Sequence, residues 1–196
     1  MIMSFYIMII VKFPNFIQRI LKNSEENFYN VINGCSNCGY GGNLHRHAKY
    51  QRTIICRSIT TRITIQRVIC PDCGKTHALI PSDLIPYFQH TIETILNLLE
   101  LINIKRQSYS EIIKSFRKFN LSFSLGHVSL YVKRFKTNMC NIEYYFRVFN
   151  NIFLEPSGSG AVILTTITNN FSVQNLNTDY SSRMNSYFLS KVVIKK

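Results

Sequence analysis

Apolar and polar positions divide the chain into helical stretches on either side of a strand-like stretch. Residues 14–33 and 82–104 carry apolar side chains at helical spacing, and the second stripe is wide and continuous. Residues 50–57 and 61–69 are rich in Ile, Thr, Val and Arg, and polar and apolar residues alternate within the second run. The pattern predicts a β-hairpin between two helical segments.

Two more helices are expected farther along the chain. Ser108 and Glu111 have the spacing of a capping box, and the apolar stripe after them predicts a helix over residues 108–119. A second helix is expected from about residue 125 to 139, and another over residues 141–149. Helices joined by so short a turn are typical of a helix-turn-helix, although an ordinary helical hairpin has the same spacing.

The two ends of the chain differ in composition. Residues 1–11 are apolar, but the run is too short to span a bilayer and lacks the features of a signal peptide. It therefore predicts a strand or a buried arm, with a membrane-surface anchor as the minor alternative and no stable membrane insertion. Residues 151–196 are rich in Asn, Ser and Thr, with a linker expected at 156–160 and a strand at 161–168.

Four cysteines form two knuckles of the same form, C-S-N-C-G at residues 35–39 and C-P-D-C-G at residues 70–74. Cys35, Cys38, Cys70 and Cys73 supply four thiolates, which are the ligand set of a closed tetrahedral Zn²⁺ site. The glycine after each knuckle lets the backbone turn back with a positive φ. We therefore predict Zn²⁺ as the cofactor.

The alternatives to zinc fit these knuckles less well. A redox C-x-x-C motif is normally single, and disulfides need an oxidising compartment, whereas a cytoplasmic location is expected here. The 31 residues between the knuckles exceed the common ribbon spacing, but a β-hairpin fills such a gap. The rival ligands are His45, His47 and His77, and Cys56 and Cys140 are expected to be buried thiols.

The predicted fold class is α+β, a small zinc-ribbon β-hairpin module followed by an all-α, helix-turn-helix-like bundle. In this prediction residues 1–33 form an apolar arm and helix, and residues 34–81 form the zinc ribbon. Residues 82–150 form the helical module, and residues 151–196 form a tail with disordered parts.

The charge of the chain points to a polyanionic partner. There are 23 Lys and Arg residues against 10 Asp and Glu, a formal net charge of +13, and nucleic acid is the usual partner of such a surplus. The alternative is a solvated basic surface that serves solubility. Arginines of the hairpin would hold phosphates, and the second helix of the helix-turn-helix would read base edges. The candidate nucleic-acid-binding residues are Arg52, Arg57, Arg62, Arg67, His127, Ser129, Lys133, Arg134 and Lys136.

The sequence does not favour an enzyme. A transposase of the RNase-H type needs three carboxylates on a large α/β core, and the acidic residues here lack that arrangement. There is no nucleophile–base pair or Gly-rich phosphate loop, and four thiolates would leave a zinc ion no position for a catalytic water. We therefore predict a non-catalytic protein.

The run R-V-I-C-P-D-C-G-K-T-H-A-L-I-P at residues 67–81 resembles a family of small bacterial zinc-ribbon proteins of unknown function. Those proteins are found with mobile elements and are often described as transposase-related. Their C-x-x-C-G-K-T-H-A-L-L-P signature, from which this chain departs at Ile80, ends the ribbon and is followed by a long helix opened by a proline and an aromatic pair, here Pro86-Tyr87-Phe88. The resemblance covers about residues 28–140 and implies that the four knuckle cysteines hold the metal.

The resemblance implies a transposase-associated module that binds DNA, and it supplies no activity. The expected function is thus a zinc-ribbon DNA-binding protein related to mobile-element transposases, with double-stranded DNA as its partner. The first alternative is an adaptor that docks on a transposase subunit through the ribbon and the apolar helix at 82–104. The others are the remnant N-terminal head of a transposase and an RNA-binding zinc ribbon.

Overall fold

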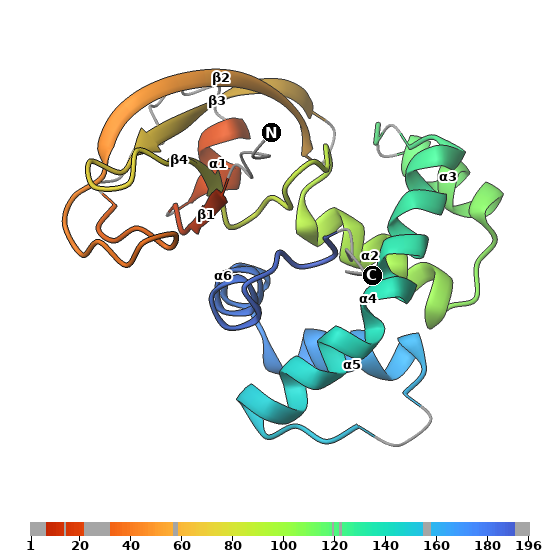
Figure 1. Ribbon diagram of the computed structural model, residues 1–196. Coiled ribbons are helices and arrows are strands. Elements are labelled where there is room, and N and C mark those ends of the chain that lie inside the picture. The colour runs from red at the N-terminus through yellow and green to blue at the C-terminus, as the bar shows by residue number, and fades with distance from the viewer. Residues whose placement is uncertain are drawn as a thin grey trace, which may run out of the picture.

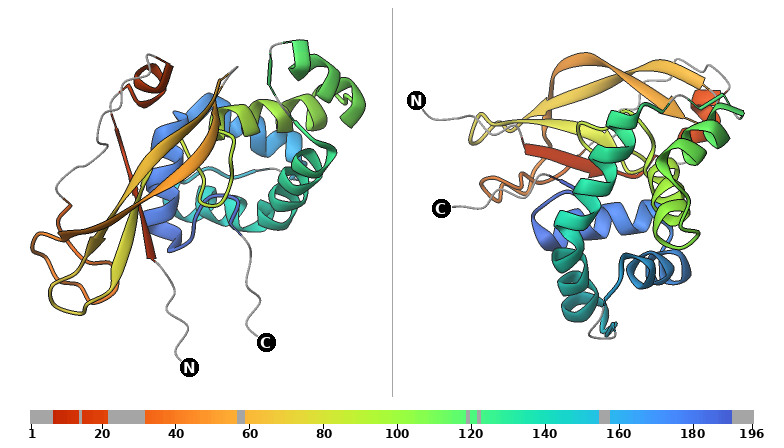
Figure 2. Two further views of the ribbon diagram at one scale, coloured as in Figure 1. Left: turned by 90° about the horizontal axis from the view of Figure 1, so that it is seen from above. Right: turned by 90° about the vertical axis from the view of Figure 1, so that its right-hand side faces the viewer.

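The computed structural model describes residues 7–13, 15–21, 32–56, 59–118, 120–121, 123–154 and 158–190. These residues form a mixed α/β structure with a four-stranded sheet on one side and the helices α2 to α6 on the other (Figures 1 and 2). The predicted combination of strands and helices is confirmed at this level. The described elements are, in chain order, β1 (Ile7–Val11), α1 (Phe16–Leu21), β2 (His45–Cys56), β3 (Ile59–Ile69), β4 (Thr76–Pro81), α2 (Ile92–Asn103), α3 (Tyr109–Lys118), α4 (Leu125–Asn150), α5 (Gly160–Asn170) and α6 (Val173–Met184).

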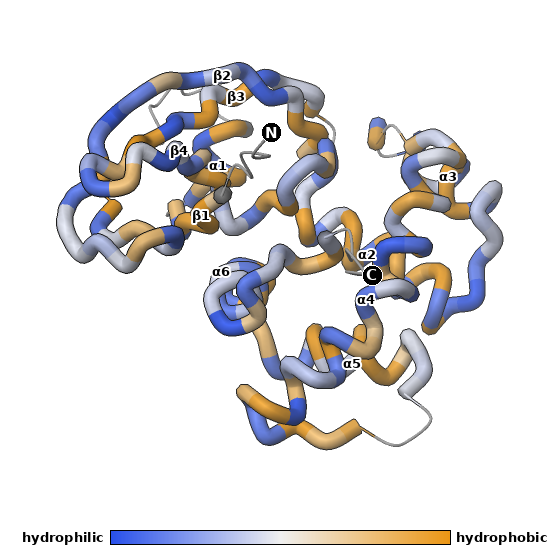
Figure 3. Tube along the Cα trace, in the orientation of Figure 1, coloured by the Kyte–Doolittle hydropathy of each residue, from blue (hydrophilic) through white to orange (hydrophobic). Residues whose placement is uncertain are grey.

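The sheet is built around the predicted hairpin. Strands β2 and β3 pair antiparallel from His45 opposite Ile69 to Cys56 opposite Ile59, with an irregularity between Arg46 and Ala48. Strand β4 adds antiparallel to β3, and β1 adds parallel to β4, so the strand order is β1-β4-β3-β2. The sheet is therefore wider than a two-stranded ribbon. In Figure 3 the arch of β2 is largely hydrophilic, whereas β1 is largely hydrophobic.

The strand expected in residues 1–11 is confirmed for Ile7–Val11. One side of β1 pairs with β4, and the other is held by Tyr187. The Tyr187 hydroxyl accepts a hydrogen bond from the Met8 N–H at 2.7 Å and donates to the Met8 carbonyl at 3.0 Å. A residue 179 positions away thus holds strand β1 by two hydrogen bonds.

Helix α1 packs on the sheet. Of the helix predicted over residues 14–33, only α1 falls in the described part of the chain, and residues 22–31 lie outside it. The core between sheet and helix is apolar, which is what holds a four-stranded sheet in water. Its fully or nearly buried members include Phe13, Phe16, Ile17, Ile20, Ile54, Ile65, Val68, Leu79, Ile80 and Leu84.

The helix predicted over residues 82–104 begins ten residues later, at Ile92. Residues 82–91 form turns instead, and Tyr87 has a φ of 70°, which a right-handed helix cannot contain. Thr91 then caps α2 by accepting a hydrogen bond from the Thr94 N–H. The apolar residues of the turns are buried like those of the helix, so their spacing imitated a longer helical stripe.

The two helices expected after α2 begin where predicted. The capping box at the start of α3 is confirmed, because the Glu111 carboxylate accepts from the Ser108 N–H at 2.7 Å and the Ser108 hydroxyl accepts from the Glu111 N–H at 3.3 Å. Helix α4 does not break near residue 140, so the two helices predicted there are one helix of 26 residues. The buried side-chain amide of Asn138 donates to the Arg134 carbonyl one turn earlier at 2.8 Å, so it finds a partner within the helix.

The tail packs into the helical bundle. The strand predicted at 161–168 is wrong, because these residues lie in α5, which is capped by Ser159. Their apolar spacing of three and four residues fits a helix face. Of the predicted linker, Pro156 and Ser157 lie outside the described residues. Helices α5 and α6 and the segment after them bury Ile163, Leu164, Ile167, Leu176, Tyr180, Phe188 and Leu189 in the same core as α2, α3 and α4.

Sheet and bundle are joined by buried hydrogen bonds. The Asn177 amide on α6 donates to the carbonyls of Ser82 and Leu84 at 2.9 and 3.0 Å, in the connection between β4 and α2. Buried carbonyls need such partners, so Asn177 fixes the bundle against the sheet. Among the described residues, no helix is long and apolar enough to cross a membrane.

Candidate metal centre and nucleic-acid surface

Each cysteine knuckle folds as a tight turn closed by backbone hydrogen bonds. The Cys35 N–H donates to the Tyr40 carbonyl at 2.7 Å, and the Gly39 N–H donates to the Cys35 carbonyl at 2.9 Å. The corresponding bonds from Cys70 and Gly74 measure 2.9 and 3.0 Å. The two glycines have φ of 80° and 67°, a region that favours glycine. The two knuckles therefore have the same local geometry, as their common sequence predicted.

The hairpin brings the knuckles together. Strand β2 begins shortly after the first knuckle, β3 ends directly before the second, and the paired ends His45 and Ile69 lie side by side. The long gap between the knuckles is thus occupied by the outward and return strands. This arrangement explains how a spacing of 31 residues is compatible with one site.

The four sulfur atoms lie close enough together to share one metal ion. The Cys35 Sγ lies 3.7 Å from the Cys73 Sγ, and the Cys38 Sγ lies 3.7 Å from the Cys70 Sγ. All four sulfurs lie within 4.8 Å of one another. A metal ion bound to four thiolates at about 2.3 Å sets neighbouring sulfurs about 3.8 Å apart. The four thiols are therefore compatible with one metal site.

The thiols of this cluster differ in acidity. A hydrogen bond from the Lys75 backbone lowers the pKa of Cys73 to about 7. A hydrogen bond from the Tyr40 backbone also lowers the pKa of Cys38, but desolvation and hydrogen bonds with the other thiols outweigh it and raise that pKa to about 12. The backbone thus stabilises thiolate at Cys73, and a metal ion would have to displace a proton from Cys38.

Two further side chains touch the sulfurs. His77 is fully buried, and its Nε2 lies 3.3 Å from the Cys35 Sγ. Burial lowers the pKa of His77 and favours its neutral form. The Asn37 amide donates to the Cys73 Sγ at 3.6 Å. Sequence reasoning missed Asn37, although an amide inside a C-x-x-C knuckle was a signal for such a contact.

The remaining histidines and cysteines of the sequence analysis lie elsewhere. His45 and His47 are exposed on β2, and the metal-compatible group found among the described residues contains the four cysteines without a histidine. Cys56 is buried as expected, with 1% of its surface exposed. Cys140 was predicted to be buried and is exposed, because it faces away from the buried stripe of α4.

Replacing His77 by phenylalanine is expected to weaken metal binding about 10- to 100-fold without abolishing it. The variant keeps a ring in the buried position and removes the nitrogen that faces the Cys35 Sγ. Competition with a chromophoric chelator measures the affinity. The control is His47→Phe on exposed β2, which should bind metal as the wild type does. Equal affinities of all three proteins would contradict a role for His77.

The predicted arginines of the hairpin do not share one face. Arg52 lies opposite Ile63 and Arg62 lies opposite Thr53, so Arg52 and Arg62 point to opposite sides of the sheet. Arg62 is exposed, whereas Arg67 is half-buried on the side of Arg52 and donates to the Thr76 hydroxyl at 2.7 Å. Arg57 lies outside the described residues. The structure therefore does not gather these arginines into one strip.

Arg52 donates hydrogen bonds within the protein. Its Nη2 donates to the Ile85 carbonyl at 2.7 Å and also to the Phe88 carbonyl. Burial lowers its pKa below that of a free guanidinium. Arg52 thus anchors the turns between β4 and α2 to strand β2, a contact that no local sequence pattern signals.

The candidate residues of α4 form a more open surface. Ser129, Lys133 and Lys136 are exposed, and their spacing of four and three residues places them on one helix face. Their side chains have no hydrogen bond or ion pair with any described residue. Arg134 is half-buried beside them. The face predicted to contact nucleic acid is therefore available to a partner.

His127 is occupied by the helix start. Its Nδ1 accepts from the Ser124 N–H at 3.4 Å, and the Ser124 hydroxyl accepts from the His127 N–H at 3.1 Å. Its ring stacks on Tyr131 at a centroid distance of 6.2 Å and meets His90 edge-on at 5.1 Å. His127 thus takes part in capping α4. Among the candidate residues of the exposed face, Ser129 is therefore the one nearest the start of the helix.

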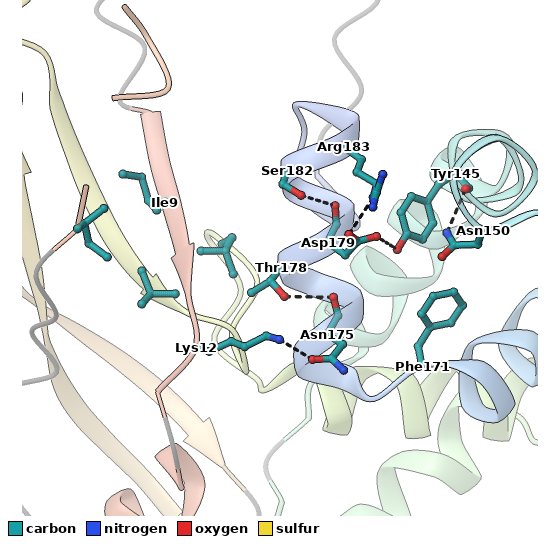
Figure 4. Close-up of a pocket in the computed structure, with 13 residues that line it drawn as sticks. Ile9, Lys12, Tyr145, Asn150, Phe171, Asn175, Thr178, Asp179, Ser182 and Arg183 are labelled. Atoms are coloured by element: carbon teal, nitrogen blue, oxygen red, sulfur yellow. Dashed lines mark hydrogen bonds and ion pairs between the residues drawn. The ribbon is translucent and has the colours of Figure 1, made fainter. Parts of the chain in front are cut away.

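The groove between β1 and α6 has a volume of about 780 Å³ (Figure 4). Its polar groups pair with one another. Lys12 donates to the Asn175 side chain at 2.6 Å, and Asp179 accepts from Tyr145 at 2.6 Å and from Arg183 at 2.9 Å. Figure 4 shows Asp179 between the last two side chains. Because these groups are already satisfied, the groove offers a ligand few polar contacts.

Residues 35–119 match a family described as a domain of unknown function (DUF6431). The matched segment begins at the first cysteine and includes all four knuckle cysteines, strands β2 to β4, α2 and α3. Its description mentions neither zinc nor transposition. Searches of curated proteins and of solved structures found no match.

Proposed function

We propose that this protein is a zinc-containing, non-catalytic DNA-binding protein related to mobile-element transposases. The zinc part rests on the four sulfurs, which lie within 4.8 Å of one another, with two pairs at 3.7 Å. Soft thiolates in a tetrahedral S₄ set favour Zn²⁺ over the hard cations Mg²⁺ and Ca²⁺, and iron is the main competitor. Four thiolates close the coordination shell, so the ion would stabilise the structure rather than activate water. The hairpin between the knuckles would then be a zinc ribbon.

The observation that carries DNA binding is an acid-free basic stretch across α3 and α4. Residues 112–142 contain six Lys and Arg residues and no Asp or Glu. Lys114, Arg117 and Lys118 on α3 are exposed, as are Lys133 and Lys136 on α4. A positively charged surface whose lysines and arginines form no ion pairs with acidic side chains attracts a polyanion such as the DNA backbone.

Helix α4 has the features of a reading helix. Its first turn is capped by Ser124, and α3 packs beside it, as in a helix-turn-helix. We propose that Lys133 and Lys136 contact phosphates and that Ser129 faces base edges, since lysines of this kind fix register and hydroxyl groups reach the bases. Arg62 on β3 would add a phosphate contact.

The burial of α2 speaks against the adaptor function. It requires an exposed apolar face on this segment, but Ile92, Ile95, Leu96, Leu98 and Leu99 are buried in the bundle. The relation to transposases, and a transposase subunit as partner, rest on the signature at residues 67–81. An RNA partner would use the same charges and is separated from duplex DNA by competition.

Duplex binding is expected to depend steeply on salt and on α4. With about six phosphate contacts, the logarithm of affinity should fall with that of salt concentration at a slope of about −5. Replacing Lys133 and Lys136 by glutamine should reduce the slope to between about −3 and about −4, because each lost phosphate contact removes about 0.9. Fluorescence anisotropy of a labelled duplex over a potassium chloride series measures the slopes of the wild type and of the double variant.

The control for this experiment is Lys105→Gln with Arg106→Gln, which removes the same charge from two exposed positions in the turn after α2. It should leave the slope near −5. A wild-type slope near zero would refute DNA binding, and equal effects of the two double variants would refute the assignment to α4. Unlabelled structured RNA that competes better than duplex DNA would favour the RNA-binding alternative.

A further inference from the structure

A second cavity, of about 550 Å³, opens on the sheet beside the turns that precede α2. Its walls come from all four strands and from residues 87–89, and include Met8, Tyr50, Arg52, Arg67, Tyr87 and Phe88. The volume lies in the range that holds a small organic ligand. The cavity is separate from the cysteine cluster and from the exposed face of α4.

The register of the sheet explains why these side chains converge. Met8 and Arg67 both pair with Ala78, so the three form a row across one face. Tyr50 and Arg52 are two residues apart on β2 and point to this same face, since Arg52 lies opposite Ile63 and alternate residues share a side. Ala78 and Ile80 of β4 add a small and a branched apolar side chain to the lining.

The cavity presents two aromatic rings to solvent. Tyr50 is 38% exposed and Tyr87 is 81% exposed. Tyr87 has a φ of 70°, a conformation that costs a bulky residue about 1–3 kcal/mol. The carbonyls of Ile85 and Phe88, on either side of Tyr87, both accept hydrogen bonds from Arg52. The protein therefore holds an exposed ring in a strained position by a buried contact.

The side chains that line the cavity carry a net positive charge. Its lining includes Arg52 and Arg67 and no acidic side chain among the described residues. The Arg52 Nη1 is buried and has no hydrogen-bond partner among those residues. A buried guanidinium nitrogen without a partner is costly, and an anionic ligand nearby would reduce that cost.

We propose that this cavity binds one unstacked nucleotide of a single-stranded nucleic acid. The base would stack on Tyr50 and Tyr87, and its phosphate would lie near Arg52 and Arg67, which is the combination of aromatic platforms and basic groups used to bind single strands. The cavity adjoins α4, because Phe88 packs on Tyr131 with ring centroids 4.9 Å apart. The proposal goes beyond duplex binding by α4 and does not depend on it.

The test is the affinity of a fluorescein-labelled oligothymidylate of twelve nucleotides for the full chain and its variants. Replacing Tyr87 by glycine removes the ring at a position whose φ glycine adopts without strain, so the fold should be retained. Affinity should fall about 5- to 150-fold, which is the effect of losing one stacked base. Tyr50→Leu should lower the affinity by a similar factor. Tyr87→Phe should keep the wild-type affinity, because the aromatic ring is retained.

Three further measurements make the test decisive. Tyr144→Ala removes a 46% exposed ring of α4 outside the cavity and should leave oligothymidylate affinity unchanged. Tyr87→Gly should leave the salt slope for blunt duplex DNA unchanged, which separates this site from the α4 face. Thymidine monophosphate should compete only weakly. Equal binding of wild type and Tyr87→Gly would overturn the site, and a mononucleotide that binds as tightly as the strand would overturn the single-stranded ligand.

Discussion

Replacement of Cys70 by serine is expected to eliminate metal binding and to unfold the knuckle end of the sheet. Cys70 has 1% of its surface exposed, and its sulfur lies 3.7 Å from that of Cys38. Structural zinc sites contribute about 10–16 kcal/mol of apparent binding free energy, which exceeds the 5–15 kcal/mol by which a typical domain is stable. Loss of one of four thiolates should therefore lower the melting temperature sharply. Elemental analysis measures the metal, and circular dichroism measures melting.

The matched control is Cys56→Ser. Cys56 is equally buried, with 1% exposure, but does not belong to the four-thiol cluster. This variant should keep one metal ion per chain and lose only the stability that a hydroxyl costs in an apolar site, about 1–3 kcal/mol. A Cys70→Ser protein that retains one metal ion per chain and the wild-type melting temperature would refute the metal site. Iron in place of zinc would correct the identity of the ion and leave the site intact.

Truncation of the chain after Leu154 is expected to abolish cooperative unfolding of the helical bundle. Helices α5 and α6 and the segment after them bury seven large apolar side chains in the core shared with α2 and α4. Each contributes about 1.5–3 kcal/mol by burial, so their loss is comparable to the entire stability of a domain. The truncation also removes Asn177, which leaves the Ser82 and Leu84 carbonyls without their partner. Thermal unfolding followed by circular dichroism measures the effect.

Truncation after Ser190 is the control, because it keeps every one of those buried residues. It should melt as the full chain does. If the protein that ends at Leu154 retained the full melting temperature, α5 and α6 would be dispensable.

The elements predicted best from sequence are those specified by local chemistry. The repeated C-x-x-C-G motif fixed two identical turns, and the pairing of its cysteines across a hairpin followed from strand-like residues between them. The capping box at Ser108 and Glu111 and the start of α4 near Leu125 were also found, because caps depend on residues within one turn.

The elements predicted badly depend on distant partners. Residues 82–91 have a helical apolar pattern, but Arg52 from β2 binds two of their carbonyls and so favours turns. The helix expected to end near residue 139 continues to Asn150, and within it the Asn138 side chain donates to the Ser190 carbonyl at 2.9 Å. Such contacts join residues 33 to 52 positions apart and leave no mark in a local window.

The same contrast between local pattern and distant contacts applies to the candidate nucleic-acid-binding residues. The face of α4 followed from helical periodicity and could be predicted. The arginines of the hairpin were grouped by composition, and strand pairing then separates Arg62 from Arg52 and Arg67. The cavity lined by Tyr50 and Tyr87 could not be predicted, because its rings come from a strand and from a turn that sequence reasoning had assigned to a helix.

The clasp of Tyr187 on Met8 bears on the order in which a newly made chain can assemble. Both knuckles and the hairpin are complete once residue 81 has been synthesised, so a metal ion can fix this part early. Strand β1 is made first but meets its second partner only after residue 187 emerges. At about 5–20 residues per second, an apolar strand with an unpaired edge waits several seconds on the ribosome. We expect this interval to be when the chain most needs a chaperone.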